Sequence, residues 1–131
     1  MMIHAWTGYK NFAWGSDDLN PISKTAWNWY GDNNTLLNTP VDSLDTLYIM
    51  GLHKEYAEAK TLVLEKLDFS GFDQFVSAFE TNIRIFGGML AAYDLEGDKR
   101  FIKKSIELAD RLLPIFDTPT GIPVNYVNLA T

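Results

Sequence analysis

The chain has 131 residues, 47% of them hydrophobic and 14% aromatic, which is enough to build one packed domain and excludes a disordered segment. Its formal net charge of −6 argues against a nucleic-acid-binding surface, because phosphate binding requires clustered lysine and arginine side chains. The absence of cysteine excludes disulfides, thiolate metal sites and a cysteine nucleophile.

The sequence also bears on targeting and membranes. The first dozen residues contain no apolar run of signal-peptide length. Residues 75–93 are apolar and close to the length that spans a bilayer, but Glu80, Asn82 and Arg84 near their middle make lipid exposure unfavourable. We therefore expect no targeting segment and no membrane anchor within this chain.

The first predicted helix covers residues 1–14, where apolar and aromatic side chains recur at helical spacing before Gly15. Residues 15–38 lack periodicity and are dense in Gly, Asn, Asp, Ser and Pro, so we expect a long loop. Its aromatic residues Trp27, Trp29 and Tyr30 could anchor the loop or form a surface on which a sugar stacks. The anchoring role is favoured, because a long loop needs such contacts in any case.

A second helix is predicted to begin at Thr39 and to run to Gly51. Thr39 is suited to the N-cap and Pro40 to the first helical position. Asp42 follows the cap by three residues, where its carboxylate can reach back to the cap.

Three further helices are predicted, separated by breaks at residues 68–73 and 97. They cover residues 53–66, 75–96 and 98–113. The last begins with Asp98 as its N-cap and ends at Pro114. The tail, residues 117–131, has no periodicity and is predicted to be a loop.

No stretch alternates with period two, so we predict an all-α chain. Residues 40–51 and 75–96 are apolar on most sides, whereas residues 53–66 and 98–113 have one apolar and one charged face. Buried and half-exposed helices alternate in this way in the α/α hairpins of a toroid, where inner helices line the centre and outer helices wrap them. Two hairpins cannot close a ring, so the sequence predicts part of a larger toroid.

Glu80 and Arg84 are the only formal charges between Asp73 and Asp94. They are four residues apart and lie on one helix face, which they share with the small residues Gly87 and Ala91. Two interpretations are open. The pair could lock the register of a buried helix, or it could place a carboxyl group at the floor of a pocket. Spacing alone favours the structural interpretation.

Two further carboxylates, Asp42 and Asp45, are predicted on one face of the helix that ends at Gly51. Asp42 has the capping explanation given above, whereas Asp45 falls in mid-helix, where aspartate is unfavourable. Together with Glu80 they are weakly indicative of an acid–base or sugar-binding centre. The two histidines, His4 and His53, have no ligand-spaced companions, so no protein metal site is predicted.

Several segments in chain order resemble the class I α-1,2-mannosidases of glycoside hydrolase family 47. They are HAW, YK and AWG from His4, DL and PIS from Asp18, VDSLDTLYIMGL from Val41, LDF from Leu67, SAFETNIRIFGGMLAAY from Ser77 and LLPIFDTPTGIPVNYVNL from Leu112. The FETNIR and DSLDTL blocks are highly specific. The resemblance extends over essentially the whole chain.

The resemblance implies that residues 1–131 are the N-terminal, incomplete part of a catalytic domain that forms an (α/α)7 barrel. Members remove terminal α-1,2-linked mannose from high-mannose N-glycans with inversion, and a calcium ion lies at the barrel floor. It further implies a place in the secretory pathway, in the endoplasmic reticulum or Golgi, and a membrane association only through an anchor that would precede this chain. The calcium ligand and the catalytic base of the family come later in the barrel.

Three residues take roles by resemblance. Glu80 matches the general acid of the family, which acts on the glycosidic oxygen through a water, and Arg84 matches the arginine that contacts substrate and orients that acid. Asp42 matches an acidic residue that the family needs for activity, and the resemblance assigns it to substrate binding with Arg84 or, given its capping position, to a structural role. A guanidinium stabilises an ionised carboxylate, so Arg84 opposes protonation of Glu80, and we expect other carboxylates outside this chain to set the acid's proton. The alternatives are a factor that recognises mannose glycans on misfolded glycoproteins and a fragment without independent activity.

Overall fold

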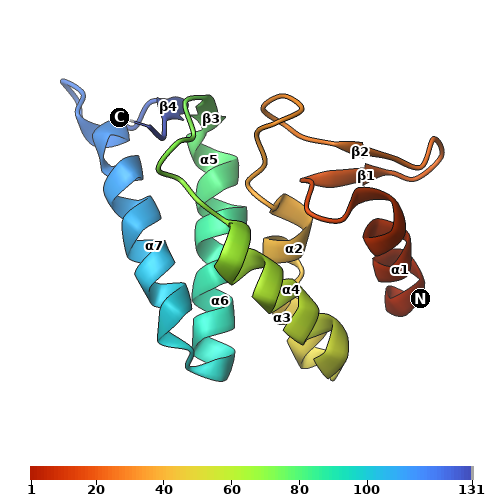
Figure 1. Cartoon of the computed structure of the whole chain (residues 1–131). Coiled ribbons are helices and arrows are strands. Elements are labelled where there is room, and N and C mark those ends of the chain that lie inside the picture. The colour runs from red at the N-terminus through yellow and green to blue at the C-terminus, as the bar shows by residue number, and fades with distance from the viewer. Residues whose placement is uncertain (131) are drawn as a thin grey trace. The chain divides into compact units, whose positions relative to one another are not determined.

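The computed structural model describes residues 1–130, and Thr131, the end of the predicted tail, lies outside the described residues. The chain divides into two compact units, Met1–Leu67 and Asp68–Thr131. Each unit combines helices with one pair of short antiparallel strands, so the chain is mostly helical, as predicted, but not all-α (Figure 1).

The first unit has six elements. They are α1 (Met2–Ala13), β1 (Asp18–Asn20), β2 (Thr25–Trp27), α2 (Asn38–Asp42), α3 (Leu44–Ile49) and α4 (His53–Lys66). Helix α1 packs against the hairpin of β1 and β2, and α2 and α3 pack against α4. An ion pair between Lys10 Nζ and Glu58 Oε2 joins α1 to α4. The bounds of α1 and α4 confirm the predicted helices over residues 1–14 and 53–66.

The predicted loop at residues 15–38 is wrong in part, because it contains the β1–β2 hairpin, in which Asp18 lies opposite Trp27. Strands of three residues are too short to produce an alternating pattern that sequence can reveal. Of the aromatic residues, Trp29 is anchored through its indole Nε1, which donates to Asp18 Oδ2. The Trp27 side chain remains half exposed.

The predicted helix from Thr39 to Gly51 is two short helices, α2 and α3, which are separated at Ser43. The N-cap position of α2 is Leu37, whose φ of 54° is left-handed, and Thr39 lies inside the helix. The proposed cap is therefore wrong. Its place is taken by a carboxylate from the preceding loop, described below.

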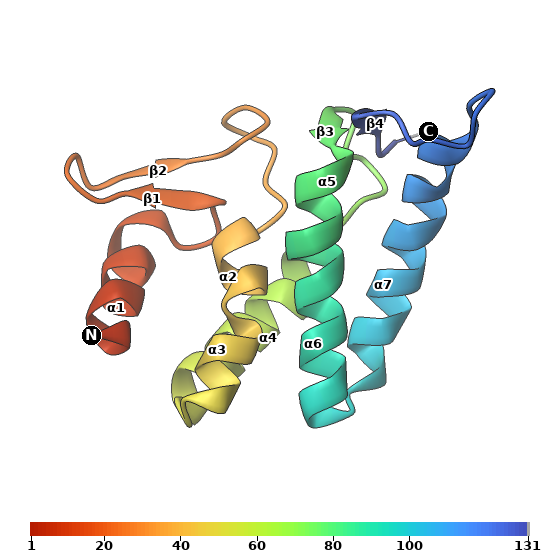
Figure 2. The same ribbon diagram turned by 180° about the vertical axis from the view of Figure 1, so that it is seen from behind.

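The second unit has seven elements. They are β3 (Phe75–Ser77), α5 (Ala78–Glu80), the π-helical segment η1 (Thr81–Phe86), α6 (Gly87–Glu96), α7 (Lys99–Leu112), the 3₁₀ segment η2 (Leu113–Phe116) and β4 (Tyr126–Asn128). Strands β3 and β4 pair antiparallel, with Val76 opposite Val127. The predicted loop over residues 117–131 is therefore wrong in part, because it contains strand β4. Helices α6 and α7 lie side by side as an antiparallel hairpin (Figures 1 and 2).

Helix α7 forms as its sequence predicts. The Asp98 side chain accepts a hydrogen bond from the Arg100 N–H and caps the helix. Gly97, with a φ of 79°, ends α6 in the left-handed region that favours glycine. The inward stripe of α7 is buried and consists of Phe101, Ser105, Leu108 and Leu112.

The prediction of one buried helix over residues 75–96 needs two corrections. Its first residues form β3, because they pair with a segment fifty residues further along the chain. Large apolar side chains of this stretch are also exposed, with exposed fractions of 69% for Phe75, 67% for Phe79 and 47% for Ile83. Within the described residues no helix has the length and apolar character that crossing a membrane requires.

Candidate functional site

The turn that carries Glu80 is capped by Ser77. The Ser77 Oγ accepts a hydrogen bond from the backbone N–H of Glu80 at 3.3 Å, at the point where β3 becomes α5. Ser77 and Glu80 form the first and fourth positions of an S-x-x-E sequence, the pattern of a capping box. This signal was readable in the sequence and was missed there.

Glu80 and Arg84 are brought together as predicted. Arg84 Nε donates to Glu80 Oε2 at 2.6 Å, an i,i+4 contact on one face of the helix. The exposed fractions of the two side chains are 31% for Glu80 and 37% for Arg84. The pair therefore does not lie within a buried helix, as the first of the two interpretations assumed. Both groups are accessible, so a ligand can reach the carboxylate and the guanidinium.

Arg84 lies within a local widening of the helix. Residues 81–86 are π-helical, and the Gly87 N–H donates to Asn82 O, five residues earlier. Single π-helical turns inside α-helices occur frequently at functional sites. A Cβ placed on Gly87 would meet only Asn82 O, at 3.6 Å, so the helix surface one turn beyond Arg84 is otherwise open.

Asp42 and Asp45 belong to the first unit and do not share a helix. Asp42 is the last residue of α2 and its side chain is exposed. Asp45 lies in the first turn of α3, where a carboxylate is favourable toward the helix N-terminus, and its Oδ1 accepts from the Thr46 N–H. The description of Asp45 as an unfavourable mid-helix residue is therefore wrong. The helix breaks at Ser43, so Asp45 falls at the start of α3 and not in the middle of one long helix.

Asp17 organises the chain that precedes Asp42, and sequence reasoning missed it. Its carboxylate is fully buried, and Oδ1 accepts from the N–H groups of Leu36 and Asn38 at 2.9 and 3.1 Å. Oδ2 accepts from the Trp29 N–H at 3.0 Å. Asn38 is the first residue of α2, so Asp17 satisfies one of the backbone N–H groups that have no partner within the helix.

The adjacent Asp18 adds a second tie. Its Oδ1 accepts from Thr39 Oγ1 at 3.2 Å, so the residue predicted to cap the helix is a donor to the hairpin instead. In the sequence, the available signal was the pair of adjacent aspartates within a loop. Aspartate side chains readily accept hydrogen bonds from nearby backbone N–H groups.

Tyr9 lies in the second half of α1 and is close to these aspartates. Burial raises the pKa of its phenol, and the nearby charges of Asp17 and Asp18 act in the same direction. The Tyr9 hydroxyl donates to Ser16 O at 2.7 Å and accepts from the Gly15 N–H at 3.2 Å. This residue is a neutral structural anchor rather than an acid for catalysis.

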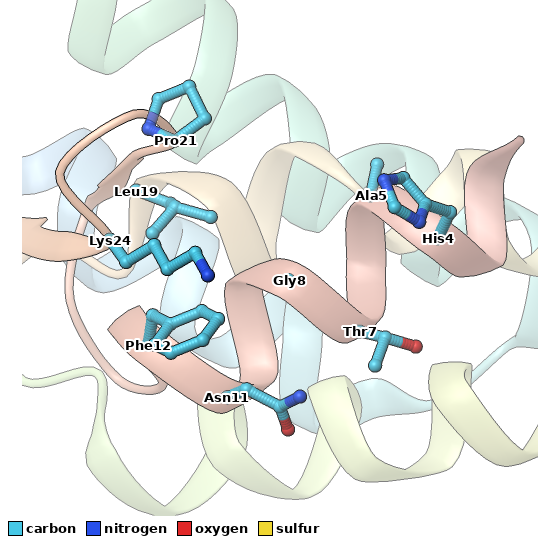
Figure 3. Close-up of a pocket in the computed structure, with 9 residues that line it drawn as sticks. All are labelled: His4, Ala5, Thr7, Gly8, Asn11, Phe12, Leu19, Pro21 and Lys24. Atoms are coloured by element: carbon cyan, nitrogen blue, oxygen red, sulfur yellow. The ribbon is translucent and has the colours of Figure 1, made fainter.

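A hollow of about 540 Å³ lies between α1 and the hairpin of the first unit (Figure 3). Lys24, whose φ of 56° is left-handed, places its Nζ 5.3 Å from the centroid of the Phe12 ring. Its polar side chains, His4, Thr7, Asn11 and Lys24, are spread around the hollow in Figure 3 and do not converge on one point. We assign no chemistry to it.

Acidic and histidine side chains do not cluster in the part of the chain that the structure describes. Within residues 1–130, no three histidine or acidic side chains gather closely enough to hold a metal ion.

The turn capped by Ser77, the Glu80–Arg84 ion pair and the sequence blocks around them together indicate one class of protein. The family model for glycosyl hydrolase family 47 matches residues 1–131. The chain belongs to this family, as its motifs predicted.

Individual relatives agree with this assignment. The chain is 52% identical over 128 residues to the mannosyl-oligosaccharide 1,2-alpha-mannosidase MNS1 of Arabidopsis thaliana, covering 98% of this chain and 22% of that protein. It is 46% identical over 131 residues to the endoplasmic reticulum mannosyl-oligosaccharide 1,2-alpha-mannosidase of Homo sapiens, covering 100% of this chain and 18% of that protein.

A solved structure is also similar. The alpha-1,2-mannosidase from Trichoderma reesei matches with a TM-score of 0.86 and 29% identity, over 95% of this chain and 28% of that one. The chain thus spans about a fifth of the length of the curated relatives it matches.

Proposed function

We propose that this chain is a segment of a glycosidase that removes terminal α-1,2-linked mannose from high-mannose N-glycans. Membership of glycosyl hydrolase family 47 and similarity to 1,2-alpha-mannosidases support the class of enzyme. The observation that carries the proposal is the contact of Arg84 Nε with Glu80 Oε2 on an accessible helix face.

Glu80 is the proposed general acid. In an inverting glycosidase one carboxylic acid gives a proton to the glycosidic oxygen, while a second carboxylate takes a proton from the water that attacks the anomeric carbon on the opposite face. The bond between the anomeric carbon and the glycosidic oxygen breaks, and mannose leaves with inverted configuration. Glu80 gives its proton through a water molecule, and the base is supplied from outside residues 1–131.

Arg84 is the proposed substrate contact. Its Nε holds the Glu80 carboxylate in one orientation, and the rest of the guanidinium offers further N–H donors, which suit sugar hydroxyl groups. Asp42 is proposed to support activity from its place at the end of α2, where its side chain is exposed.

The wider context follows from the family resemblance. We propose that the segment forms part of an (α/α)7 barrel, that the enzyme requires calcium bound by groups outside this chain, and that it acts in the secretory pathway. The relative from Homo sapiens named for the endoplasmic reticulum supports the location.

A chimaera tests the proposal. Residues 1–131 would replace the matched segment of Arabidopsis MNS1, and release of mannose from a high-mannose oligosaccharide would be measured. We expect activity that EDTA abolishes and that Glu80→Gln lowers by roughly a hundredfold or more, since general acid catalysis contributes about 10²–10⁴-fold. Glu65→Gln, an exposed residue of α4, is the matched control and should leave the rate unchanged.

Two outcomes would redirect the proposal. Full activity in the Glu80→Gln chimaera would remove Glu80 from the role of acid. Binding of the oligosaccharide without mannose release in the unsubstituted chimaera would favour the glycan-recognition alternative.

A further inference from the structure

The loop between β2 and α2 carries a short motif that the proposed reaction does not use (Figure 1). Residues 33–35 read Asn-Asn-Thr, so Asn33 is followed after one residue by a threonine, and no proline lies between them. This is the acceptor motif for N-linked glycosylation, which modifies surface loops of proteins in the secretory pathway. No other asparagine in the sequence has serine or threonine two positions later. Three-residue matches also occur by chance, so the surroundings of Asn33 decide what the motif means.

The Asn33 side chain is exposed and makes no hydrogen bond within residues 1–130. The other two amides of residues 28–34 are engaged. Asn28 Nδ2 donates to Asp32 O at 2.9 Å, and Asn34 Nδ2 donates to Tyr30 O at 3.1 Å. In this part of the loop, Asn33 is therefore the amide to which a sugar can be attached without the loss of a hydrogen bond.

The backbone at Asn33 forms a turn. The Asn34 N–H donates to Gly31 O at 2.9 Å, and Gly31 has a φ of 95°, which favours glycine. Asp32 and Asn33 occupy the two central positions of this turn, and both side chains are exposed. A large substituent on Asn33 is accommodated there, because the solvent has room for it and the core is not displaced.

Thr35, which supplies the hydroxyl of the motif, is held by the folded chain. Its Oγ1 donates to Asp17 Oδ1 at 2.9 Å and accepts from the Leu37 N–H at 2.9 Å. The motif requires a hydroxyl at this position, so the transferring enzyme has to reach a group that the folded loop already uses. Attachment of a glycan therefore precedes closure of the loop on Asp17.

We infer that Asn33 is an N-glycosylation site that is modified during synthesis, before the loop closes on Asp17. In the transfer, Asn33 Nδ2 forms a bond to the anomeric carbon of an oligosaccharide carried on a lipid diphosphate. The bond from that carbon to the diphosphate oxygen breaks, the lipid diphosphate leaves, and the amide nitrogen releases one proton. Folding then brings the Thr35 hydroxyl to Asp17 and leaves the glycan on the exposed turn.

The inference rests on the proposed function in one respect, the secretory pathway, because the lipid-linked donor and the transferring enzyme are found there. Relatives from Rattus norvegicus and Homo sapiens that are named for the endoplasmic reticulum support this compartment. It does not rest on the proposed reaction, since neither Glu80 nor Arg84 takes part in the transfer.

Translation in the presence of microsomes tests the inference. The full 131-residue chain would carry a cleavable secretion signal, which makes entry into the compartment independent of natural targeting. Its intact mass would be measured before and after treatment with an amidase that removes N-linked glycans. We expect a gain of one oligosaccharide, which the amidase removes and which leaves an aspartate at position 33 in the peptide mass spectrum.

Matched variants separate the acceptor from its neighbours. Asn33→Gln and Thr35→Ala should abolish the gain in mass. Asn34→Gln changes the middle position of the motif, where any residue except proline is accepted, and should retain it, as should Thr35→Ser, which keeps a hydroxyl. Asp17→Ala frees Thr35 and should give a modified fraction equal to or higher than that of the unsubstituted chain.

Three results would overturn the inference. An unsubstituted chain without any gain in mass would show that Asn33 is not an acceptor even inside the compartment. A gain that persists in Asn33→Gln would place the glycan elsewhere, and a lower modified fraction in Asp17→Ala would contradict the order of attachment and folding. Failure of the proposed function looks different, because the chimaera would then release no mannose while Asn33 still carried its glycan.

Discussion

Arg84 Nε lies 2.6 Å from Glu80 Oε2, and both side chains keep about a third of their surface exposed. A contact of this kind is screened by water, so it adds little to stability even though it fixes the orientation of the carboxylate. The pair is thus better suited to present a carboxylate to a ligand than to hold the helix together.

We predict that Glu80→Gln changes the free energy of unfolding of the isolated chain by no more than about 0.5 kcal/mol, the value of an exposed i,i+4 pair. Urea unfolding followed by circular dichroism measures it. A loss several times larger would mean that the pair is structural. The loss of mannose release in the chimaera could then not be assigned to chemistry.

Asp17→Ala should be among the most destabilising substitutions in the first unit. It leaves the buried N–H groups of Leu36 and Asn38, and the partly buried N–H of Trp29, without their acceptor, and unsatisfied buried donors are costly. We expect a loss of about 3 kcal/mol or more in the free energy of unfolding.

Asp32→Ala is the matched control for this prediction. Asp32 belongs to the same loop and its side chain is exposed, so its removal should change stability by at most about 0.5 kcal/mol. Equal effects of the two substitutions would show that Asp17 does not organise the loop.

Tyr9 should make the first unit sensitive to alkali. Its pKa is raised in the folded chain, so the folded state holds the phenolic proton more tightly than the unfolded state, whose pKa is about 10. The resulting stabilisation is fully present below pH of about 10 and is lost as pH rises above that value. Ultraviolet titration of the six tyrosines should show one that ionises only with unfolding.

Tyr9→Phe provides the comparison. It removes the hydrogen bonds to Ser16 O and from the Gly15 N–H, and we expect it to cost about 1–2 kcal/mol at neutral pH. The delayed ionisation should disappear from the titration. If it persists, another tyrosine is responsible.

Ser77→Ala should loosen the turn that carries Glu80. Loss of an N-cap side chain costs about 1 kcal/mol, and here the cap acts on the Glu80 N–H itself. In the chimaera we expect a lower rate of mannose release, whereas Ser77→Thr, which retains a capping hydroxyl, should recover most of it. Equal rates for the alanine and threonine variants would contradict a positioning role.

Much of the helical framework was predictable from the sequence. The periodicity of residues 53–66 and 98–113 and the cap at Asp98 identify α4 and α7, because these signals act over a few neighbouring residues. The i,i+4 spacing likewise predicted the contact of Glu80 with Arg84, and the sequence blocks around them predicted the family.

Other features depend on contacts between distant parts of the chain. Strand β3 forms at Phe75–Ser77 because residues 126–128 pair with it, and the helix that apolar periodicity placed at Phe75 begins only at Ala78. Asp17 displaces Thr39 as the group that satisfies the start of α2, although more than twenty positions separate them in sequence.

The sequence by itself determined the family, the main helices and the adjacency of Glu80 and Arg84, because local spacing and motif identity are sufficient for these. Only the tertiary structure decided that the pair is accessible, that Asp17 is the buried acceptor of its loop and that Phe79 and Ile83 are exposed. Exposure and hydrogen-bond partnership depend on which distant segments fold against a residue, and that information is absent from local spacing.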